Sequence, residues 1–164
     1  MTDVFSPQRR SYIMSCVRSK NTSLEVEFRK RLFKLGYRYR INVAGLPGHP
    51  DLVLPKYKTI IQINGCFWHG HNCPRVRLPK SNPEYWRTKI VRNKKRDKVN
   101  IKSLIELGWS CVLIWECASK QKYSVVLLNN ITRFLRSRTK FLMVGENKFG
   151  KLAKSTKLEK YLRS

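Results

Sequence analysis

Apolar residues recur with the period of an α-helix in three long stretches of the chain. The first, NTSLEVEFRKRLFKLG, has candidate caps at residues 21–23 and a stop signal at Gly36. The second runs from Pro83 to Leu107 and is followed by Gly108, and the third is YSVVLLNNITRFLRS. A short helix is also predicted in SPQRRSYIMSCVRSKN. The apolar face of the first long helix comprises Leu24, Phe28, Leu32 and Leu35.

Between these helices lie short stretches with the pattern of β-strands. YRYRIN alternates, DLVL and TIIQIN are rich in β-branched residues and are joined by a tight Pro-Lys-Tyr-Lys turn, and WSCVLIWEC has the composition of a buried strand. These segments predict a small sheet flanked by helices. Residues 139–164 differ in composition, with lysines or arginine at every third position from Lys151 to Arg163, and are predicted to form a helical extension or a mobile basic arm.

Length and charge narrow the class of protein. A chain of 164 residues is large enough for one domain with its own core. The net charge of +25 indicates a polyanionic partner, and counterion release by Lys and Arg makes nucleic acid the leading candidate. No apolar run is long enough for a membrane span or a signal peptide, so we expect a soluble intracellular protein without a membrane partner.

The segment NGCFWHGHNC is rich in potential metal ligands. Tetrahedral zinc takes four thiolate or imidazole ligands, often with two from one tight loop and others from a distant element. Five candidates compete for those four places, so one histidine is free to act as a general acid or base. An exposed polar loop is the alternative, and Cys16 and Cys111 fit buried thiols better. The five candidates are Cys66, His69, His71, Cys73 and Cys117.

Three carboxylates are candidates for chemistry. Asp51 follows the turn LPGHP at the start of a strand, where it can bind a magnesium ion or simply belong to the turn. Asp97 falls near the middle of the inward face of the helix beginning at Pro83, where it can point toward a metal-bound water or pair with an inward Arg or Lys. Glu25 lies at the border of its helix face, with Arg29 as a surface partner four residues on.

Aromatic residues accompany the basic charge. Phe67 and Trp68 lie inside the Cys/His segment, and Trp86 opens the basic helix. Such side chains can wedge between base pairs of DNA and kink the duplex, although core packing is the usual place of a tryptophan. A loop held by a metal would support these side chains rigidly, which favours insertion into DNA over core packing for Phe67 and Trp68.

Several of these motifs, in this order, resemble one known family, the very short patch repair (Vsr) endonucleases that nick DNA beside a T:G mismatch. The resemblance runs from about residue 9 to residue 136. It rests on the segments RSYIMSCVRSKNTSLEVEFRKRLFKLGYRYR, LPGHPDLV, GCFWHGHNC, WRTKIVRNKKRD and LGWSCVLIWEC. It implies an α/β fold of the restriction-endonuclease-like (PD-(D/E)XK) type, with a mixed sheet flanked by helices, and a magnesium-dependent DNA endonuclease.

The resemblance also implies roles for single residues. Asp51 would bind Mg2+ together with the backbone carbonyl of Ile63. His69 would be the catalytic histidine, and Glu25 and Asp97 would act through metal-bound water. A structural Zn2+ would be held by Cys66, His71, Cys73 and Cys117, and the residues intercalated beside the mismatch would be Phe67, Trp68 and Trp86.

Two departures from the family pattern lie next to each other. Ile63 stands where relatives can carry threonine, which a backbone ligand tolerates, and Asn64 stands where relatives can carry histidine or aspartate. Asn64 cannot transfer a proton, and Gln62 and Asn64 do not supply the Glu and Lys of the wider superfamily. We expect a cytoplasmic, nucleoid-associated monomer with an endonuclease domain at residues 1–138 and a basic extension at 139–164. Mismatch-repair proteins are candidate partners, and the rival functions are a zinc-stapled DNA-binding module without catalysis and a nuclease for unmismatched DNA.

Overall fold

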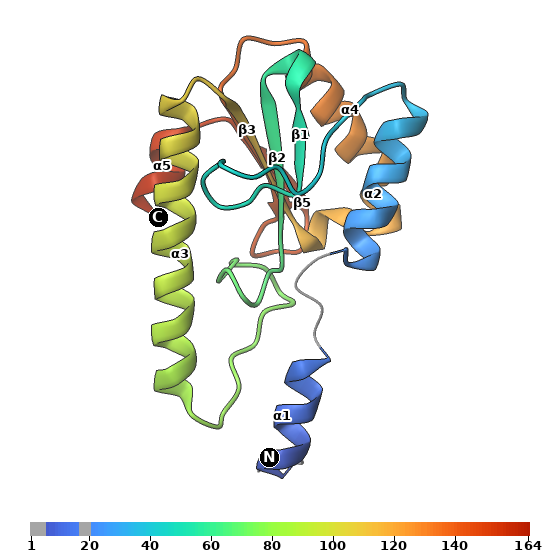
Figure 1. The fold of residues 1–164 in the computed structure, drawn as a ribbon. Coiled ribbons are helices and arrows are strands. Elements are labelled where there is room, and N and C mark those ends of the chain that lie inside the picture. The colour runs from blue at the N-terminus through green and yellow to red at the C-terminus, as the bar shows by residue number, and fades with distance from the viewer. Residues whose placement is uncertain (1–5, 17–20) are drawn as a thin grey trace.

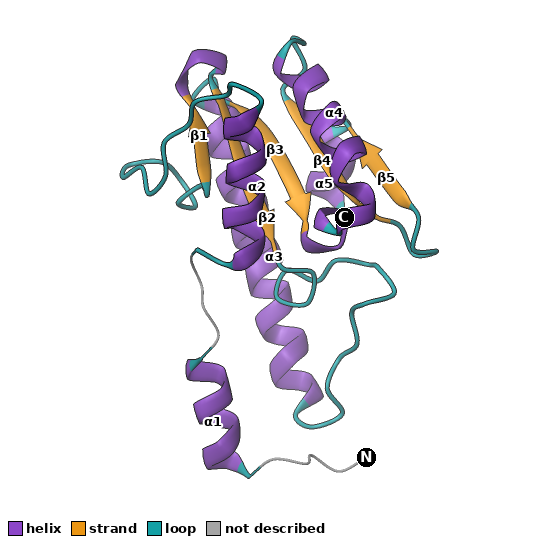
Figure 2. Cartoon of the chain, turned by 90° about the vertical axis from the view of Figure 1, so that its right-hand side faces the viewer, coloured by secondary structure: helices purple, strands orange, loops and turns teal. Residues whose placement is uncertain are grey.

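The computed structural model describes residues 6–16 and 21–164 and contains one mixed β-sheet with helices on both faces (Figures 1 and 2). Its inner three strands are parallel to one another, and both edge strands are antiparallel to their neighbours. This arrangement confirms an α/β fold with a mixed sheet. The strands, in their order across the sheet, are β1 (Leu52–Leu54), β2 (Thr59–Asn64), β3 (Ser110–Trp115), β4 (Phe141–Glu146) and β5 (Leu152–Ser155).

The predicted helices are present, with bounds close to those expected. A further short helix, α5, lies near the C-terminus, and 3-10 turns occur at Pro55–Tyr57, Glu116–Ser119 and Gln121–Tyr123. Gly36 ends the first long helix with a positive φ of 85°, as its position predicted. Leu35 is 52% exposed, contrary to the predicted face, because the helix ends before it. The helices are α1 (Pro7–Ser15), α2 (Ser23–Lys34), α3 (Pro83–Glu106), α4 (Ser124–Leu135) and α5 (Leu158–Arg163).

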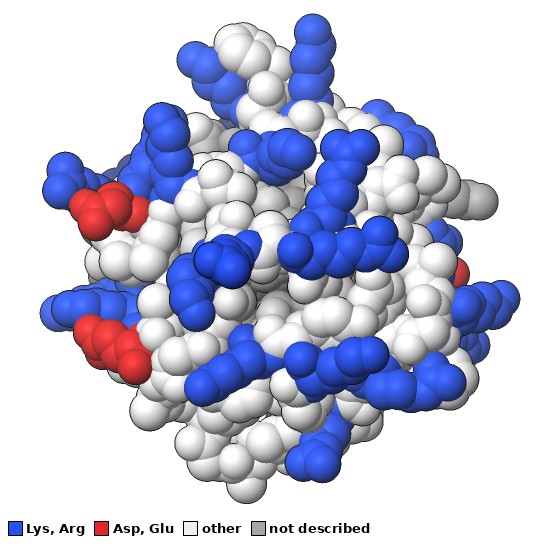
Figure 3. All heavy atoms as spheres, turned by 90° about the horizontal axis from the view of Figure 1, so that it is seen from above, with Lys and Arg blue, Asp and Glu red and all other residues white. Residues whose placement is uncertain are grey.

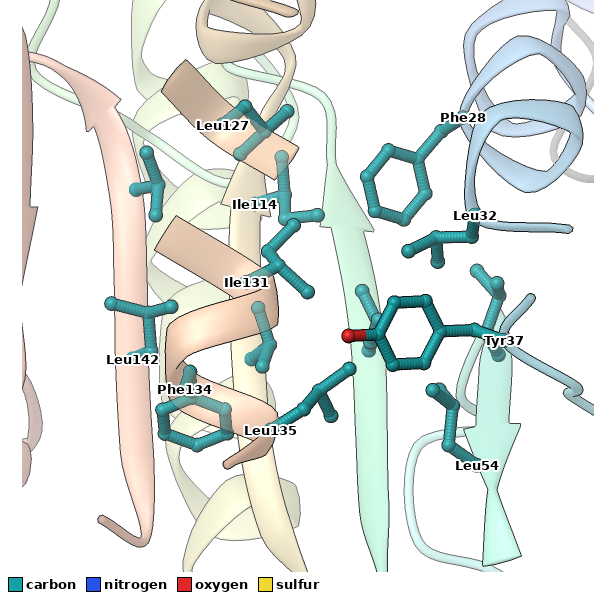
Figure 4. Packing of buried hydrophobic residues seen from close by; sticks show 14 of the residues in the cluster. Phe28, Leu32, Tyr37, Leu54, Ile114, Leu127, Ile131, Phe134, Leu135 and Leu142 are labelled. Carbon is teal, nitrogen blue, oxygen red and sulfur yellow. The ribbon is translucent and has the colours of Figure 1, made fainter. Parts of the chain in front are cut away.

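Each face of the sheet has its own hydrophobic core. On one face, Phe28 and Leu32 of α2 and Ile131 of α4 pack with side chains of the strands, as Figure 4 shows. On the other face, Ile101 of α3 packs with Phe141 of β4 and with the rest of a second cluster. The parallel strands are therefore covered on both faces, which explains why their sequences are almost continuously apolar.

The segment YRYRIN does not form the predicted strand. Of this segment, only Arg40 pairs with a strand, in an isolated antiparallel bridge to Val53 of β1. The chain then turns away at Asn42, whose φ of 53° is left-handed, and Tyr37 is buried in the core. An alternating pattern forms a strand only where a partner edge is long enough to pair with it, and β1 has three residues.

The C-terminal segment is neither a helical extension nor a mobile arm. It forms β4, β5 and α5, and β4 pairs in parallel with β3, so the sheet continues across the boundary expected at residue 139. The apolar run Phe141–Val144 is a buried strand that the high charge of its surroundings concealed. Cys111 is buried as expected, whereas Cys16 is exposed. No helix within the described ranges is long and apolar enough to cross a membrane.

Candidate functional site

Asp51 lies immediately before β1, and the turn that precedes it fixes its place. Gly48 in this turn has a φ of 76°, and a Cβ atom there would meet the Nδ2 atom of Asn100 on α3 at 2.8 Å. The Asp51 carboxylate accepts a hydrogen bond of 2.7 Å from the backbone N–H of Ile63 on β2. Burial, together with the nearby Glu25 carboxylate, raises the pKa of Asp51 to about 6, against the opposing effect of that hydrogen bond. A cation bound here would relieve both costs.

Glu25 lies in the first turn of α2, where its carboxylate takes part in capping the helix. It accepts hydrogen bonds from the backbone N–H of Asn21 at 3.0 Å and from the Thr22 hydroxyl at 2.8 Å, while the Thr22 oxygen accepts from the backbone of Glu25. Arg29 binds the same carboxylate at 2.7 Å. Both side chains of this ion pair are largely buried, so the description of Arg29 as a surface partner is wrong. The helix pattern alone places Glu25 at the border of the apolar face of α2, and packing of the surrounding segments buries the Glu25–Arg29 pair.

Asp97 is buried on the inner face of α3, as the helical spacing predicted. Its Oδ2 atom lies in a short hydrogen bond with Nδ1 of His69, and its Oδ1 atom is 3.5 Å from the Arg96 guanidinium. The sequence left open whether this carboxylate faces a site or an inward basic residue, and the structure pairs it with a histidine. A carboxylate on Nδ1 orients the ring and leaves Nε2 as the atom available for proton transfer.

These residues line one cleft of about 600 Å³. It lies beside the carboxyl end of β2, between the start of α2 and the middle of α3. The cleft brings together the five residues expected there and several that were not predicted to belong to the site. Of the latter, His49 lies in the LPGHP turn. Its position two residues before Asp51 in the sequence could have indicated that it belongs to the site. The expected residues are Glu25, Asp51, Ile63, His69 and Asp97, and the others include Arg29, His49, Asn64, Arg96 and Asn100.

Four of the five candidate zinc ligands lie together at the neighbouring end of the sheet. The ligand atoms of Cys66, His71, Cys73 and Cys117 are all within 4.8 Å of one another. His69 is not among them, because its ring turns to Asp97. The strand register brings the distant cysteine close, since Asn64 on β2 lies beside Trp115 on β3 and both chains continue from there by two residues.

The distances in this Cys/His cluster fit a tetrahedral ion. His71 Nδ1 lies 3.6 Å from Cys66 Sγ and 3.4 Å from Cys117 Sγ. Tetrahedral zinc, with bonds of about 2.3 Å to sulfur and about 2.0–2.1 Å to nitrogen, places such atoms about 3.6 Å apart. The hydrogen bond with Cys66 lowers the pKa of the Cys117 thiol to about 4, while the pKa of Cys66 is raised. The cluster can therefore hold a metal ion.

Neighbouring groups hold the Cys/His cluster in place. The His71 ring stacks on Trp115 at 4.3 Å and is almost parallel to it. Gly145 of β4 lies against this pair, where a Cβ atom would come within 2.6 Å of the Trp115 ring and 2.9 Å of the His71 ring. The backbone N–H of Glu146 donates to Cys117 Sγ at 3.1 Å. Such contacts with ligand side chains fix their orientation before any ion binds.

The three aromatic residues predicted to wedge into DNA are in contact with one another. The ring centroid of Phe67 lies 5.1 Å from that of Trp68 and 5.2 Å from that of Trp86. None of the three belongs to either buried core cluster of the described residues, and each is partly exposed. Tyr85 and Lys89 extend this aromatic group, with the Lys89 ammonium 5.5–5.9 Å from the rings of Trp68, Tyr85 and Trp86. The sequence analysis missed these two, although both lie on the same exposed start of α3.

Comparison with known proteins places the chain among DNA-nicking enzymes. The family model for DNA mismatch endonuclease Vsr matches residues 2–75. The type II nicking enzyme V.NmeAIP of Neisseria meningitidis is 46% identical over 74% of this chain and 87% of its own length. The type II nicking enzyme V.XorIIP of Xanthomonas oryzae is 45% identical over 71% of this chain and 86% of its length. The DNA mismatch endonuclease Vsr of Escherichia coli is 38% identical over 72% of this chain and 76% of its length.

Proposed function

The chain belongs to the DNA mismatch endonuclease Vsr family and is a DNA endonuclease, and from that premise we propose that it nicks duplex DNA beside the thymine of a T:G mismatch by metal-dependent hydrolysis. The observation that carries this proposal is the cleft in which two carboxylates and a histidine–carboxylate pair face one space of about 600 Å³. A module that only bound DNA would have no need for buried acids in a chain of net charge +25, because carboxylates repel phosphates.

Asp51 is the proposed ligand of a magnesium ion in this cleft, together with the backbone carbonyl of Ile63. The buried carboxylate with its raised pKa fits a hard cation that prefers oxygen ligands. When bound, Mg2+ would neutralise charge that builds up on the phosphate during hydrolysis. Glu25 would accept hydrogen bonds from water in the metal's shell, and Arg29 holds this carboxylate in place at 2.7 Å.

His69 is the proposed proton acceptor. With Nδ1 held by Asp97, its Nε2 would take a proton from the attacking water as the new bond to phosphorus forms and the bond to the leaving sugar oxygen breaks. Asp97 positions the ring and would stabilise its protonated form, so it acts through His69. Asn64 also lines the cleft but carries no titratable group, so its role is limited to hydrogen bonding.

The Cys/His cluster is the proposed site of a structural zinc ion. All four places of a tetrahedron are filled by protein ligands, which leaves no open position for a substrate. Its part in the reaction is mechanical, because the segment between Cys66 and Cys73 carries His69 on one side and Phe67 and Trp68 on the other. The ion would therefore fix the distance between the cutting residues and the residues that contact the bases.

Phe67, Trp68 and Trp86 are the proposed wedge beside the mismatch. Unstacking a base step costs a few kcal/mol and is easiest where pairing is already weak, so a rigid aromatic group selects such sites. We also propose that the sheet and its helices form a restriction-endonuclease-like core, that the chain acts as a monomer on DNA in the cytoplasm, and that mismatch-repair proteins are its partners.

The direct test is nicking of a labelled duplex with one T:G mismatch, beside a T:A duplex of the same sequence, in the presence of Mg2+. We expect cleavage next to the mismatched thymine alone. The variant Asp51→Ala should lose nicking but still bind the duplex, because the aromatic group and the basic surface are unchanged. Equal nicking by this variant would contradict the assignment of Asp51.

Two other outcomes would support the rival functions. Equal cleavage of both duplexes would indicate a nuclease for unmismatched DNA. Tight binding with no cleavage across several mismatches and divalent metals would indicate a zinc-stapled binding module. Electrophoresis under denaturing conditions separates nicked from intact strands and decides among the three.

A further inference from the structure

The end of the sheet opposite the catalytic cleft carries many exposed Lys and Arg side chains. The amino ends of β2, β3 and β4 lie there, together with the Pro55–Tyr57 turn and the carboxyl ends of α2, α3 and α4. Figure 3 looks onto this end and shows Lys and Arg side chains spread over most of it, with acidic groups confined to its margins. We call the following exposed residues the amino-end surface: Lys34, Arg38, Lys56, Lys58, Arg136, Arg138 and Lys140.

Sequence segments far apart in the chain converge to form the amino-end surface. The backbone N–H of Ser110 donates to the carbonyl of Lys58, and that of Cys111 donates to the carbonyl of Lys140. The three contributing segments, residues 34–40, 55–59 and 136–140, contain no Asp or Glu. Within the described ranges, none of the seven cationic side chains forms an ion pair.

Support of the helix ends explains only part of this charge. A cation near a helix carboxyl terminus is favourable, and Lys34, Lys58 and Arg136 occupy such places, with the Lys58 side chain lying against Gly108 just after α3. The others lie elsewhere: Arg38 follows α2 and stacks on the Phe33 ring, Lys56 is in the hairpin turn, and Arg138 and Lys140 lie between α4 and β4. Unpaired like charges repel one another and disfavour the compact state, so they call for a partner of opposite charge.

The amino-end surface lies at the other end of the sheet from the cleft, so its charges add little to the attraction of DNA held in the cleft. The five residue steps from Thr59 to Asn64 along β2 span about 17 Å at about 3.3 Å per residue. The Debye length at physiological ionic strength is about 8 Å, so exposed charges at one end of the strand are largely screened from the other.

We propose that the amino-end surface binds a second segment of duplex DNA through its phosphates, without sequence preference, while the cleft holds the first. Phosphates of a duplex present a dense row of negative charge, which suits seven cations that form no ion pair and are spread over three segments better than a small anion would. A chain with two duplex sites can pass from one DNA segment to another before it releases the first. The proposal assumes that the cleft takes DNA, as proposed above, but it does not require catalysis.

The test uses the full-length protein bound to an immobilised T:G duplex without added Mg2+, and measures capture of a second, fluorescent, perfectly paired duplex. We expect capture by the wild-type protein to fall about 100-fold or more between 50 and 200 mM salt, as at least four phosphate contacts require. The quadruple variant Lys56→Gln, Arg136→Gln, Arg138→Gln and Lys140→Gln should lose at least about tenfold in capture. The slope of log affinity against log salt should fall by about 3.6.

The matched control removes the same charge from another exposed region, with Lys148→Gln, Lys151→Gln, Lys157→Gln and Lys160→Gln. It should retain capture within about twofold, and both quadruple variants should nick the T:G duplex at the wild-type rate. Analytical ultracentrifugation should find complexes of one protein chain with two duplexes.

Three results of these experiments would overturn the proposal, and a fourth comes from a competition with an acidic polypeptide. They are absence of capture by the wild-type protein, equal loss in both quadruple variants, and complexes that always contain two protein chains. Preferential binding of an acidic polypeptide over DNA at this surface would also overturn it, in favour of a protein partner. Capture without any nicking would uphold this proposal and contradict only the proposed function.

Discussion

His69 and His71 are two residues apart and belong to regions with opposite chemistry. His69 faces the cleft, where carboxylates lie beside one another and part of the space is open. His71 belongs to the Cys/His cluster, where every ligand faces a common centre and neighbouring rings and backbone groups hold it. The cleft therefore contains carboxylates whose charge a metal and substrate would balance, whereas the thiolates of the Cys/His cluster would be balanced by a single ion. Substitution of a residue in the cleft should therefore lower the nicking rate, whereas substitution of a residue in the Cys/His cluster should lower the stability of the fold.

The largest expected effect separates these two histidines. His69→Ala should reduce the nicking rate by about 10²–10⁴-fold, because the proton acceptor is lost, with little change in melting temperature. His71→Ala should lose bound zinc and lower the melting temperature, and its nicking should fall in step with the folded fraction. Single-turnover rates and thermal melts of both variants decide the matter. Equal melting temperatures for the two variants would remove the distinction between the regions.

Loss of the ion is a second test of the Cys/His cluster, through its zinc content and its stability. We expect about one zinc per chain in the purified protein, and Cys117→Ser should lose it, because the substitution removes one of the four ligands. The free energy of unfolding should fall by at least about 3 kcal/mol, in the range of other losses of buried networks and metal sites. A metal-sensitive dye measures the zinc and urea unfolding measures the stability. Cys111→Ser, which changes a buried cysteine outside the cluster, should keep the zinc.

A smaller effect is expected from the residue behind His71. Gly145→Ala would place a Cβ atom within 3 Å of both the Trp115 and His71 rings, so the stacked pair must shift. We expect a loss of about 1–3 kcal/mol in stability and weaker zinc retention against a chelator. Nicking at saturating zinc should remain close to wild type, since His69 faces away from this contact. Ala153→Gly, on the neighbouring strand at the register position of Gly145, controls for a change in strand propensity.

The smallest effect on nicking is expected from Tyr161→Phe in α5. This buried side chain packs on Phe141 and lines the cavity behind the His69–Asp97 pair. Tyr161→Phe should keep the packing and change the nicking rate by less than about threefold. Tyr161→Ala should cost about 3–5 kcal/mol of stability through the cavity that it leaves. Urea unfolding and single-turnover nicking of both variants test this. A large rate loss in Tyr161→Phe without a loss of stability would assign the Tyr161 hydroxyl to the chemistry in the cleft.

The sequence by itself determined the elements with a strong local signal. The helix stripe, the Asn21–Ser23 caps and Gly36 were enough to place α2, and the apolar run was enough for β3. Asp97 was predicted to face inward because a 3.6-residue period fixes the direction of each side chain on a long helix. The crowding of Cys and His between residues 66 and 73 likewise indicated a metal site before any geometry was known. These features depend on residues close together in the chain.

Only the tertiary structure decided the contacts between distant segments. It placed β4 beside β3 although the segment after residue 139 has the composition of a basic tail, because burial in a sheet depends on neighbours and not on overall charge. It turned His69 toward Asp97 and His71 toward Cys117, a choice between two histidines that their spacing left open. It buried the Glu25–Arg29 pair, and it gathered cations from three segments at the end of the sheet opposite the cleft. Periodicity gives the direction of a side chain on its own element, whereas pairing of elements, which decides what that side chain meets, is a property of the whole fold.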